Sequence, residues 1–160
     1  MDEPSRGGAG KWLWPISCAL LCLGLGVASG FSSAGGGGEW YQSLKKPPGT
    51  PPSWVFGPVW TVLYLMMGVA CGRLVSRRAW HAVWVFGMQF VLNVAWTPVF
   101  FGAQETGISL AIIAGLWFGI VALIQMTWKV DRVSSFLLMP YLAWVSYATY
   151  LNTGFFWLNR

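Results

Sequence analysis

The chain has 160 residues, of which 56% are hydrophobic and only 9% are charged. A water-soluble domain normally carries about 25% charged residues, so the composition excludes that class and predicts an integral membrane protein. The net charge of +5 has no soluble basic face to carry it, which excludes nucleic acid as a partner. We attribute it to membrane topology and contact with anionic headgroups.

Residues 1–11 are polar and are predicted to form a disordered tail. Five stretches follow that lack Asp, Glu and Lys, and each is long enough to cross roughly 30 Å of hydrocarbon as a helix. They cover residues 12–31, 54–74, 80–101, 107–128 and 134–157. We therefore predict an all-α integral membrane protein in which residues 12–160 form a compact bundle of five transmembrane helices.

The first stretch has an alternative interpretation as a cleaved signal peptide, because Arg6 and Lys11 precede it and small residues follow it. Its length favours a membrane helix instead. Gly24, Gly26 and Gly30 also give it a small-residue face suited to helix packing.

The only long predicted loop covers residues 32–53. It begins with glycines 35–38 and ends with Pro47, Pro48, Pro51 and Pro52, so we expect a flexible beginning and a stiff, partly polyproline-like end. The other loops are short, which makes consecutive helices antiparallel neighbours.

Small residues recur at every fourth position on three stretches and allow backbones to approach closely. These sets are Gly26 with Gly30, Gly68 with Gly72, and Ala111 with Gly115 and Gly119. The pattern does not distinguish packing within one chain from packing between two, and a homodimer through one of these faces is favoured. Cys18, Cys22 and Cys71 are interpreted as small packing residues, and no metal site is expected.

Basic residues are distributed unequally between the two sides of the predicted bundle. Seven lie on the side of the N-terminus and three on the other side, which favours a cytoplasmic N-terminus in a bacterial cell membrane. An organelle outer membrane, such as the mitochondrial one, is the alternative location.

Twelve residues are tryptophan, and they divide into two groups. One group lies at helix ends or in the long loop, as in a membrane aromatic belt: Trp12, Trp14, Trp40, Trp54, Trp80, Trp84, Trp128 and Trp157. Trp60, Trp96, Trp117 and Trp144 lie inside the stretches, where an indole N–H needs a partner or a ligand. Trp117 comes from a stretch with no polar stripe and is interpreted as packing.

Gln89, Asn93 and Thr97 are spaced by four and form a polar stripe that should face the bundle interior. The stripe is either an interhelical hydrogen-bond clamp or a set of groups that orient a polar handle on an apolar ligand. Trp144 and Tyr147 lie midway along the last stretch, after a kink expected at Pro140.

Depth along the stretches places Trp60, Asn93, Trp96, Trp144 and Tyr147 beneath the long loop. An aromatic, amide-bearing cavity under a stiff loop suits a flat hydrophobic ligand. The spans offer no paired acids and no nucleophile beside a base, so hydrolytic chemistry has no visible residues.

Several strings resemble the translocator protein family, also called the tryptophan-rich sensory (TspO/MBR) or peripheral benzodiazepine receptor family. The resemblance extends over nearly the whole chain from Trp12. It rests on Glu39-Trp40-Tyr41 with Leu44, Lys46 and Pro47; on Pro51-Pro52 with Trp54, Gly57-Pro58, Trp60, Leu63 and Tyr64; on Gln89, Asn93, Trp96, Pro98 and Phe100-Phe101-Gly102; and on Pro140-Tyr141-Leu142-Ala143-Trp144 with Ala148, Thr149, Leu151 and Asn152.

The resemblance implies a five-helix bundle, commonly dimeric, that binds porphyrins such as protoporphyrin IX and haem, sterols, and isoquinoline or benzodiazepine drugs under the first loop. No cofactor is required beyond such a ligand. The expected ligand-binding residues are Trp60, Tyr64, Gln89, Asn93, Trp96, Trp144, Tyr147, Ala148 and Leu151. The expected lid residues are Trp40, Pro47, Pro51 and Pro52.

Two departures from the family pattern affect these expectations. Family members often read Lys-Pro-Ser-Trp where this chain reads Lys46-Pro47-Pro48-Gly49, so a loop tryptophan is missing and a looser lid is expected. The cholesterol-recognition pattern of animal members requires a Tyr and a basic residue where this chain has Thr153 and Trp157, which leaves sterol binding open.

Three functions are consistent with the sequence. The leading hypothesis is a membrane receptor or carrier of tetrapyrroles, acting in their handling, transport or stress sensing. The second is an enzyme that degrades porphyrin with light and oxygen, with Trp60 and Trp144 as catalytic residues, as the resemblance implies for bacterial members. The third is a regulatory membrane scaffold that docks partners through Arg73, Arg77 and Arg78.

Overall fold

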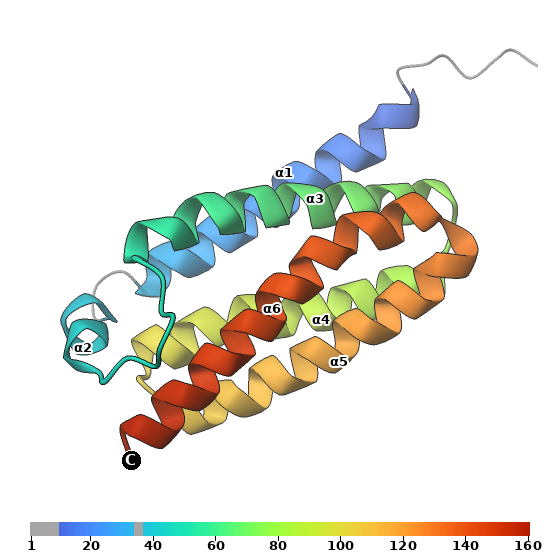
Figure 1. Ribbon diagram of the computed structural model, residues 1–160. Coiled ribbons are helices and arrows are strands. Elements are labelled where there is room, and N and C mark those ends of the chain that lie inside the picture. The colour runs from blue at the N-terminus through green and yellow to red at the C-terminus, as the bar shows by residue number, and fades with distance from the viewer. Residues whose placement is uncertain (1–9, 34–36) are drawn as a thin grey trace, which may run out of the picture.

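The computed structural model describes residues 10–33 and 37–160, which form helices and connecting turns without a strand. Residues 1–9 of the expected tail and residues 34–36 of the expected glycine-rich loop lie outside the described part. The elements are α1 Gly10–Ser33, α2 Gly37–Ser43, the 3₁₀ turn η1 Ser53–Val55, α3 Phe56–Ser76, α4 Trp80–Thr97, the π-helical turn η2 Pro98–Gly102, α5 Thr106–Val130 and α6 Arg132–Leu158. Figure 1 shows the long helices α1, α3, α4, α5 and α6 side by side, with α2 and the C-terminus at the same end of the bundle.

Four helical segments are long and apolar enough to cross a membrane: Trp12–Phe31, Ser53–Ser76, Trp80–Gly102 and Thr106–Val130. The fifth expected span coincides with α6, which has the necessary length at 27 residues. Its hydropathy is lower because it carries polar side chains such as Ser134, Ser135 and Asn152, all of them buried. The expectation of five spans is thus matched by four helices in length and composition, and by α6 in length alone.

Helix packing follows the order α1, α3, α6, α5, α4, and α1 also touches α4. The closest approach is between α1 and α3. A Cβ atom on Gly68 would lie 2.4 Å from Ala19 Cα, and one on Gly72 would lie 2.4 Å from Pro15 Cα. Only glycine permits this contact, which makes α1 an integral part of the bundle.

One glycine of each of the other two small-residue faces is also packed within the chain. A Cβ atom on Gly26 would collide with the Tyr64 ring, and one on Gly119 would lie 3.0 Å from Gln89 Cβ. These glycines are therefore not free for a second protomer, and the homodimer stays a prediction.

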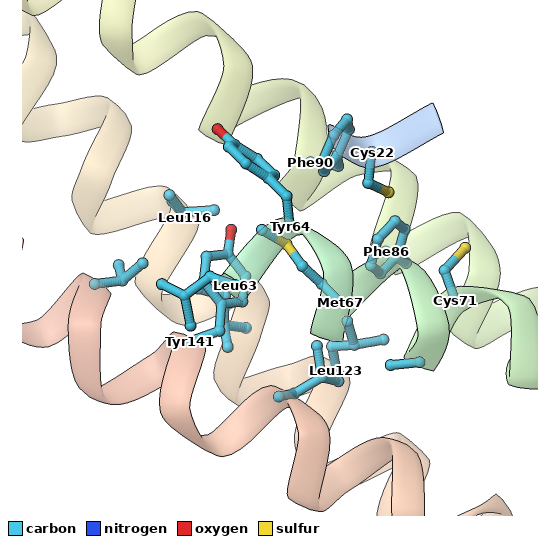
Figure 2. Packing of buried hydrophobic residues seen from close by; sticks show 14 of the residues in the cluster. Cys22, Leu63, Tyr64, Met67, Cys71, Phe86, Phe90, Leu116, Leu123 and Tyr141 are labelled. Atoms are coloured by element: carbon cyan, nitrogen blue, oxygen red, sulfur yellow. The ribbon is translucent and has the colours of Figure 1, made fainter. Parts of the chain in front are cut away.

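The apolar core lies between α3, α4, α5 and α6, and Figure 2 shows its side chains meeting around Met67. Met67, Leu74, Ile120 and Leu138 have no accessible surface. Cys22 and Cys71 are buried at the edge of this cluster as free thiols. By contrast, the seven tryptophans expected at the helix ends are all exposed, by 41% for Trp128 to 74% for Trp84, as side chains facing lipid should be.

One local expectation was wrong, and one helix of the expected extent changes its form at its end. The long loop contains the helix α2, because the rings of Trp40 and Tyr41 pack on Phe100 and on Phe101 and stabilise a helical turn there. The third long helix does not continue regularly to residue 101. Proline has no N–H for the α-helical ladder, and from Pro98 the backbone forms a π turn in which Ala103 N bonds Pro98 O at 2.8 Å.

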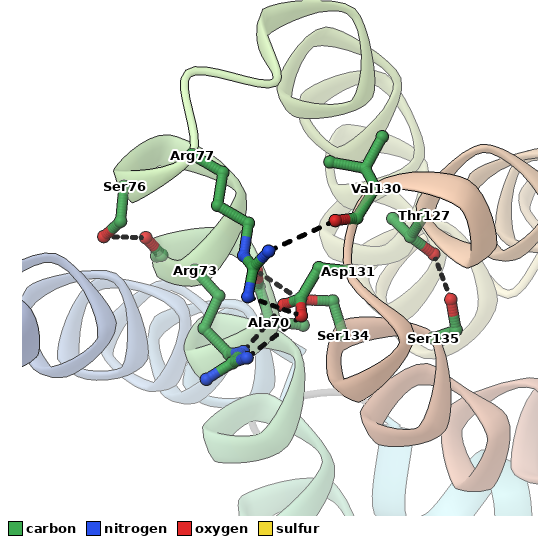
Figure 3. Close-up of polar contacts among 10 residues, drawn as sticks. Ala70, Arg73, Ser76, Arg77, Thr127, Val130, Asp131, Ser134 and Ser135 are labelled. Carbon is green, nitrogen blue, oxygen red and sulfur yellow. Dashed lines mark hydrogen bonds and ion pairs between the residues drawn. The ribbon is translucent and has the colours of Figure 1, made fainter.

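The end of the bundle remote from α2 is held by a buried acid (Figure 3). Asp131 accepts hydrogen bonds from Arg73 at 2.7 and 3.0 Å and from Ser134 at 2.7 Å. Arg77 forms a second ion pair with the same carboxylate at 3.1 Å. Two of the three arginines considered as a docking surface therefore link α3 to the beginning of α6.

Candidate functional site

A cavity of about 520 Å³ lies between α1, α3 and α4 at the end of the bundle covered by α2. Its position follows from the α1–α3 packing. The two helices touch at Gly68 and Gly72 and again at Gly26, whereas Gly30 and Gly57, which line the cavity, have no atom within 4 Å of a built Cβ. The helices therefore separate beyond the contact of Gly26 with Tyr64, and the space between them is the cavity.

Aromatic side chains form the inner wall of this cavity. Trp60 stacks on Tyr64 with ring centroids 5.4 Å apart, and Trp96 stacks on Phe100 at 5.1 Å. Trp60, Tyr64 and Trp96 all line the cavity, together with Tyr41, Phe56 and Phe101. This wall offers flat apolar faces on which a conjugated ring can stack.

A chain of hydrogen bonds lies behind Tyr64. The Tyr64 hydroxyl donates to Asn93 Oδ1 at 2.8 Å, Asn93 Nδ2 donates to Tyr141 Oη at 2.9 Å, and the Tyr141 hydroxyl donates to Gln89 Oε1 at 2.8 Å. The chain joins α3, α4 and α6. Of the two interpretations of the polar stripe, Gln89 and Asn93 therefore match the interhelical clamp, and they reach the cavity only through Tyr64.

Thr97, the third residue of the stripe, lines the cavity itself. Gln89 Nε2 is buried and has no partner within the described residues. The stripe thus divides along α4 into a buried clamp and one cavity-lining hydroxyl.

Trp96 is held by a second polar contact between helices. Its indole Nε1 donates to Asn152 Oδ1 at 2.9 Å, and Asn152 Nδ2 donates to Thr106 O at 2.9 Å. Asn152 was not predicted as a site residue. The signal that could have identified it is the presence of an amide within the family-like string of the last span, and the structure shows this amide to be buried. Trp117 is also bonded, through Nε1 to Ser146 Oγ at 2.8 Å, so its role goes beyond apolar packing.

The residues expected from α6 are separated from the large cavity. Ala148 and Leu151 line a second void of about 20 Å³. Four aromatic residues line both spaces and divide them; we call Tyr41, Phe56, Trp96 and Phe101 the aromatic partition. Sequence reasoning missed Tyr41, Phe56 and Phe101, whose contacts come from separate segments of the chain.

Trp144 and Tyr147 line neither space. The Trp144 ring packs edge-on against Phe56 with centroids 5.9 Å apart, and against Tyr147 at 5.7 Å. Trp144 Nε1 is buried with no hydrogen-bond partner among the described residues. The structure thus brings Trp60, Tyr64 and Trp96 together at the cavity and places Trp144 and Tyr147 behind Phe56.

The lid is attached to α6. The Tyr147 hydroxyl donates to Gly49 O, the Tyr150 hydroxyl donates to Pro48 O at 3.0 Å, and Pro47 is buried against Gly154. Gly49 has a φ of 82°, a conformation that favours glycine. The two acceptors are main-chain carbonyls, which any residues at positions 48–49 would supply, so the departure from the family pattern changes the backbone conformation at Gly49 and not the number of acceptors.

Other predicted lid residues lie outside the cavity wall. Trp40 packs edge-on against Phe100 with ring centroids 5.5 Å apart. Pro51 and Pro52 do not line the cavity. Within residues 10–33 and 37–160, no group of three His, Cys, Asp or Glu side chains is arranged to hold a metal ion. The aromatic side chains that line the cavity can hold a flat apolar molecule against their rings.

Comparison with known proteins matches this chain to one family over most of its length. A sequence model of the TspO/MBR family matches residues 18–158. The chain is 38% identical over 148 residues to Tryptophan-rich protein TspO of Chlorobaculum tepidum, covering 89% of this chain and 93% of that protein. It is 34% identical over 151 residues to Translocator protein of Bos taurus, with coverage of 90% and 89%. Protein CrtK of Rhodobacter capsulatus is 34% identical over 127 residues, with coverage of 76% and 79%.

Proposed function

This chain belongs to the TspO/MBR family of multi-pass membrane proteins, and on that premise we propose that it is a receptor or carrier that binds porphyrins in the cavity beneath α2. The observation that carries the proposal is the apolar cavity of about 520 Å³ with the stacked pair Trp60 and Tyr64 in its wall. This volume lies within the usual range for a small-molecule site. A flat macrocycle would gain stacking contacts on Trp60 and bury its apolar edge.

We further propose that α6 crosses the membrane with the four more apolar helices, which makes five spans. Its polar side chains are directed into the protein: Ser134, Ser135 and Asn152 are buried and hydrogen-bonded. Polar groups satisfied inside a bundle do not prevent a helix from spanning a membrane.

The proposed binding mode extends from the cavity toward α6. Trp96 is fixed by its bond to Asn152, whereas Phe56 and Phe101 have no polar group to hold them. Rotation of these two rings would join the large cavity to the void at Ala148 and Leu151 and bring Trp144 within reach of the ligand. The α6 residues expected from the family resemblance would then complete the site.

The test is a titration of the purified protein with protoporphyrin IX in the dark, followed by tryptophan fluorescence. Trp60→Ala and Tyr64→Ala should each raise Kd by about tenfold, because each removes one face of the stack. Trp84→Phe is the matched control, since Trp84 is 74% exposed on α4 and lies outside the cavity. Unchanged affinity in both cavity variants would contradict the proposal.

A second candidate function is light- and oxygen-dependent porphyrin breakdown, with Trp60 as electron donor to the excited ligand. The observation that favours it is the position of Trp60 in the cavity wall, where its ring can touch a bound macrocycle. Illumination under oxygen should then yield an open-chain product, and Trp60→Phe should stop this reaction while affinity changes little. Loss of porphyrin at the same rate without protein would reject the enzyme.

A further inference from the structure

Polar groups of the cavity differ between its deep part and its mouth. In the deep part, the Tyr64 hydroxyl is bonded to Asn93 and the Trp96 indole N–H to Asn152. At the mouth, Gln42 and Ser53 line the cavity and are exposed, and their side chains form no hydrogen bond with another described residue. The mouth therefore offers the polar end of a ligand two available side chains, in addition to the Thr97 hydroxyl elsewhere in the cavity wall.

A cation without an acidic partner among the described residues lies beside one residue of the cavity wall. Lys46 Nζ lies 5.2 Å from the ring centroid of Tyr41, a residue of the cavity wall. The described ion pairs all involve Asp131 at the opposite end of the bundle, so within the described chain Lys46 has no carboxylate partner. An ammonium beside an aromatic face is weakly stabilised and remains available for an anion.

Tyr41 contributes a second feature. The residue is only 8% exposed, and its hydroxyl is buried without a hydrogen-bond partner among the described residues. Burial raises the pKa of the Tyr41 hydroxyl above its ordinary value, so the group is a neutral donor. A buried donor without an acceptor is costly, and it would gain a partner if the ring turned toward a bound oxygen.

We propose that Lys46 and the Tyr41 hydroxyl form an anion-binding subsite at the cavity mouth. This subsite binds a carboxylate of a flat apolar ligand and orients the ring system of the ligand toward Trp60. The proposal rests on the porphyrin-binding function and deepens it by naming the ligand class: planar hydrophobic molecules that carry a carboxylate at one edge. A carboxylate cannot enter the apolar part of the cavity without a large desolvation cost. It therefore remains at the mouth, where Lys46 neutralises it.

The experiment compares protoporphyrin IX with its dimethyl ester, which has the same macrocycle and no carboxylate. The full chain is placed in nanodiscs of phosphatidylcholine, a lipid without net charge, and titrated in the dark. Lys46→Gln should raise Kd for the acid by about fivefold, a typical effect of one partly exposed ion pair, and leave Kd for the ester within twofold. Lys46→Arg keeps the charge and should retain the affinity for the acid.

Lys45→Gln is the matched control. It removes the same charge one residue earlier, while the contacts of Lys45 with Asn159 use its backbone N and O and survive the substitution. An equal loss of acid and ester in Lys46→Gln, no loss of acid, or an equal effect of Lys45→Gln would each overturn the subsite. If the unmodified protein shows saturable quenching with neither compound, the porphyrin function itself fails, which is distinguishable from these results.

Discussion

Tyr64 and Asn93 are joined by a 2.8 Å hydrogen bond between α3 and α4, and the ring of the same tyrosine stacks on Trp60 in the cavity wall. One amide therefore fixes the position of an aromatic surface that it does not itself form. This relationship connects the stability of the bundle to the shape of the proposed site.

Asn93→Ala should weaken both properties at once. The substitution leaves the Tyr64 hydroxyl without its acceptor and Tyr141 without a donor, at a cost of about 1–3 kcal/mol in the free energy of unfolding. Ligand affinity should also fall because the Tyr64 ring is no longer held. Thermal unfolding in detergent and a protoporphyrin IX titration measure the two effects. Tyr64→Phe, which removes one bond and keeps the ring, should lower stability with a smaller change in affinity.

Gly68→Ala should destabilise the bundle through the α1–α3 contact. The added Cβ would lie 2.4 Å from Ala19 Cα, and since the neighbour is backbone, α1 must move as a whole, at about 1–3 kcal/mol. A lower Tm measures this loss. Gly24→Ala is the control on α1, since no atom lies within 4 Å of its built Cβ. Equal Tm values for the two variants would show that the helices are not in tight contact.

Acid should weaken the remote end of the bundle through Asp131. The hydrogen bond from Arg73 is the main cause that lowers the pKa of this carboxyl from 3.8 to about 2. Because the folded-state pKa is the lower one, the stabilisation is complete above pH 4 and is lost as the pH falls toward 2. The contribution is on the order of 2 kcal/mol. Asp131→Asn should remove it at pH 7 and flatten the dependence of unfolding on pH between 4 and 2, whereas a variant as acid-sensitive as the unmodified chain would contradict the assignment.

Ala148→Phe tests whether a ligand extends past the aromatic partition. The phenyl ring is larger than the void of about 20 Å³ between α6 and the partition, so it would close this void to a ligand. We expect at least a fivefold rise in Kd for protoporphyrin IX if Phe56 and Phe101 rotate to admit it, a loss of about 1 kcal/mol of binding free energy. Ala143→Phe, on the exposed face of the same helix, should bind normally. Normal binding by Ala148→Phe would confine the ligand to the large cavity.

How far the sequence predicts this protein depends on the kind of feature. Hydropathy along the chain identified the four apolar spans and α6, because a bilayer selects length and polarity residue by residue. The same local criterion separated the exposed interfacial tryptophans, such as Trp84, from Trp60 and Trp96, which line the cavity. The strings that resemble the family predicted a ligand-binding site at the end of the bundle covered by the long loop.

Only the tertiary structure decided which side chains at that end contact one another and which of them line the cavity. The rotation of each helix determines that Asn93 holds Tyr64, that Trp96 bonds to Asn152, and that Trp144 lies behind Phe56. The pairing of Asp131 with Arg73 joins residues 58 positions apart. The polarity of a segment is a local property, whereas these contacts depend on helix rotation, on the glycine contact that brings α1 against α3, and on the separation of those two helices that opens the cavity.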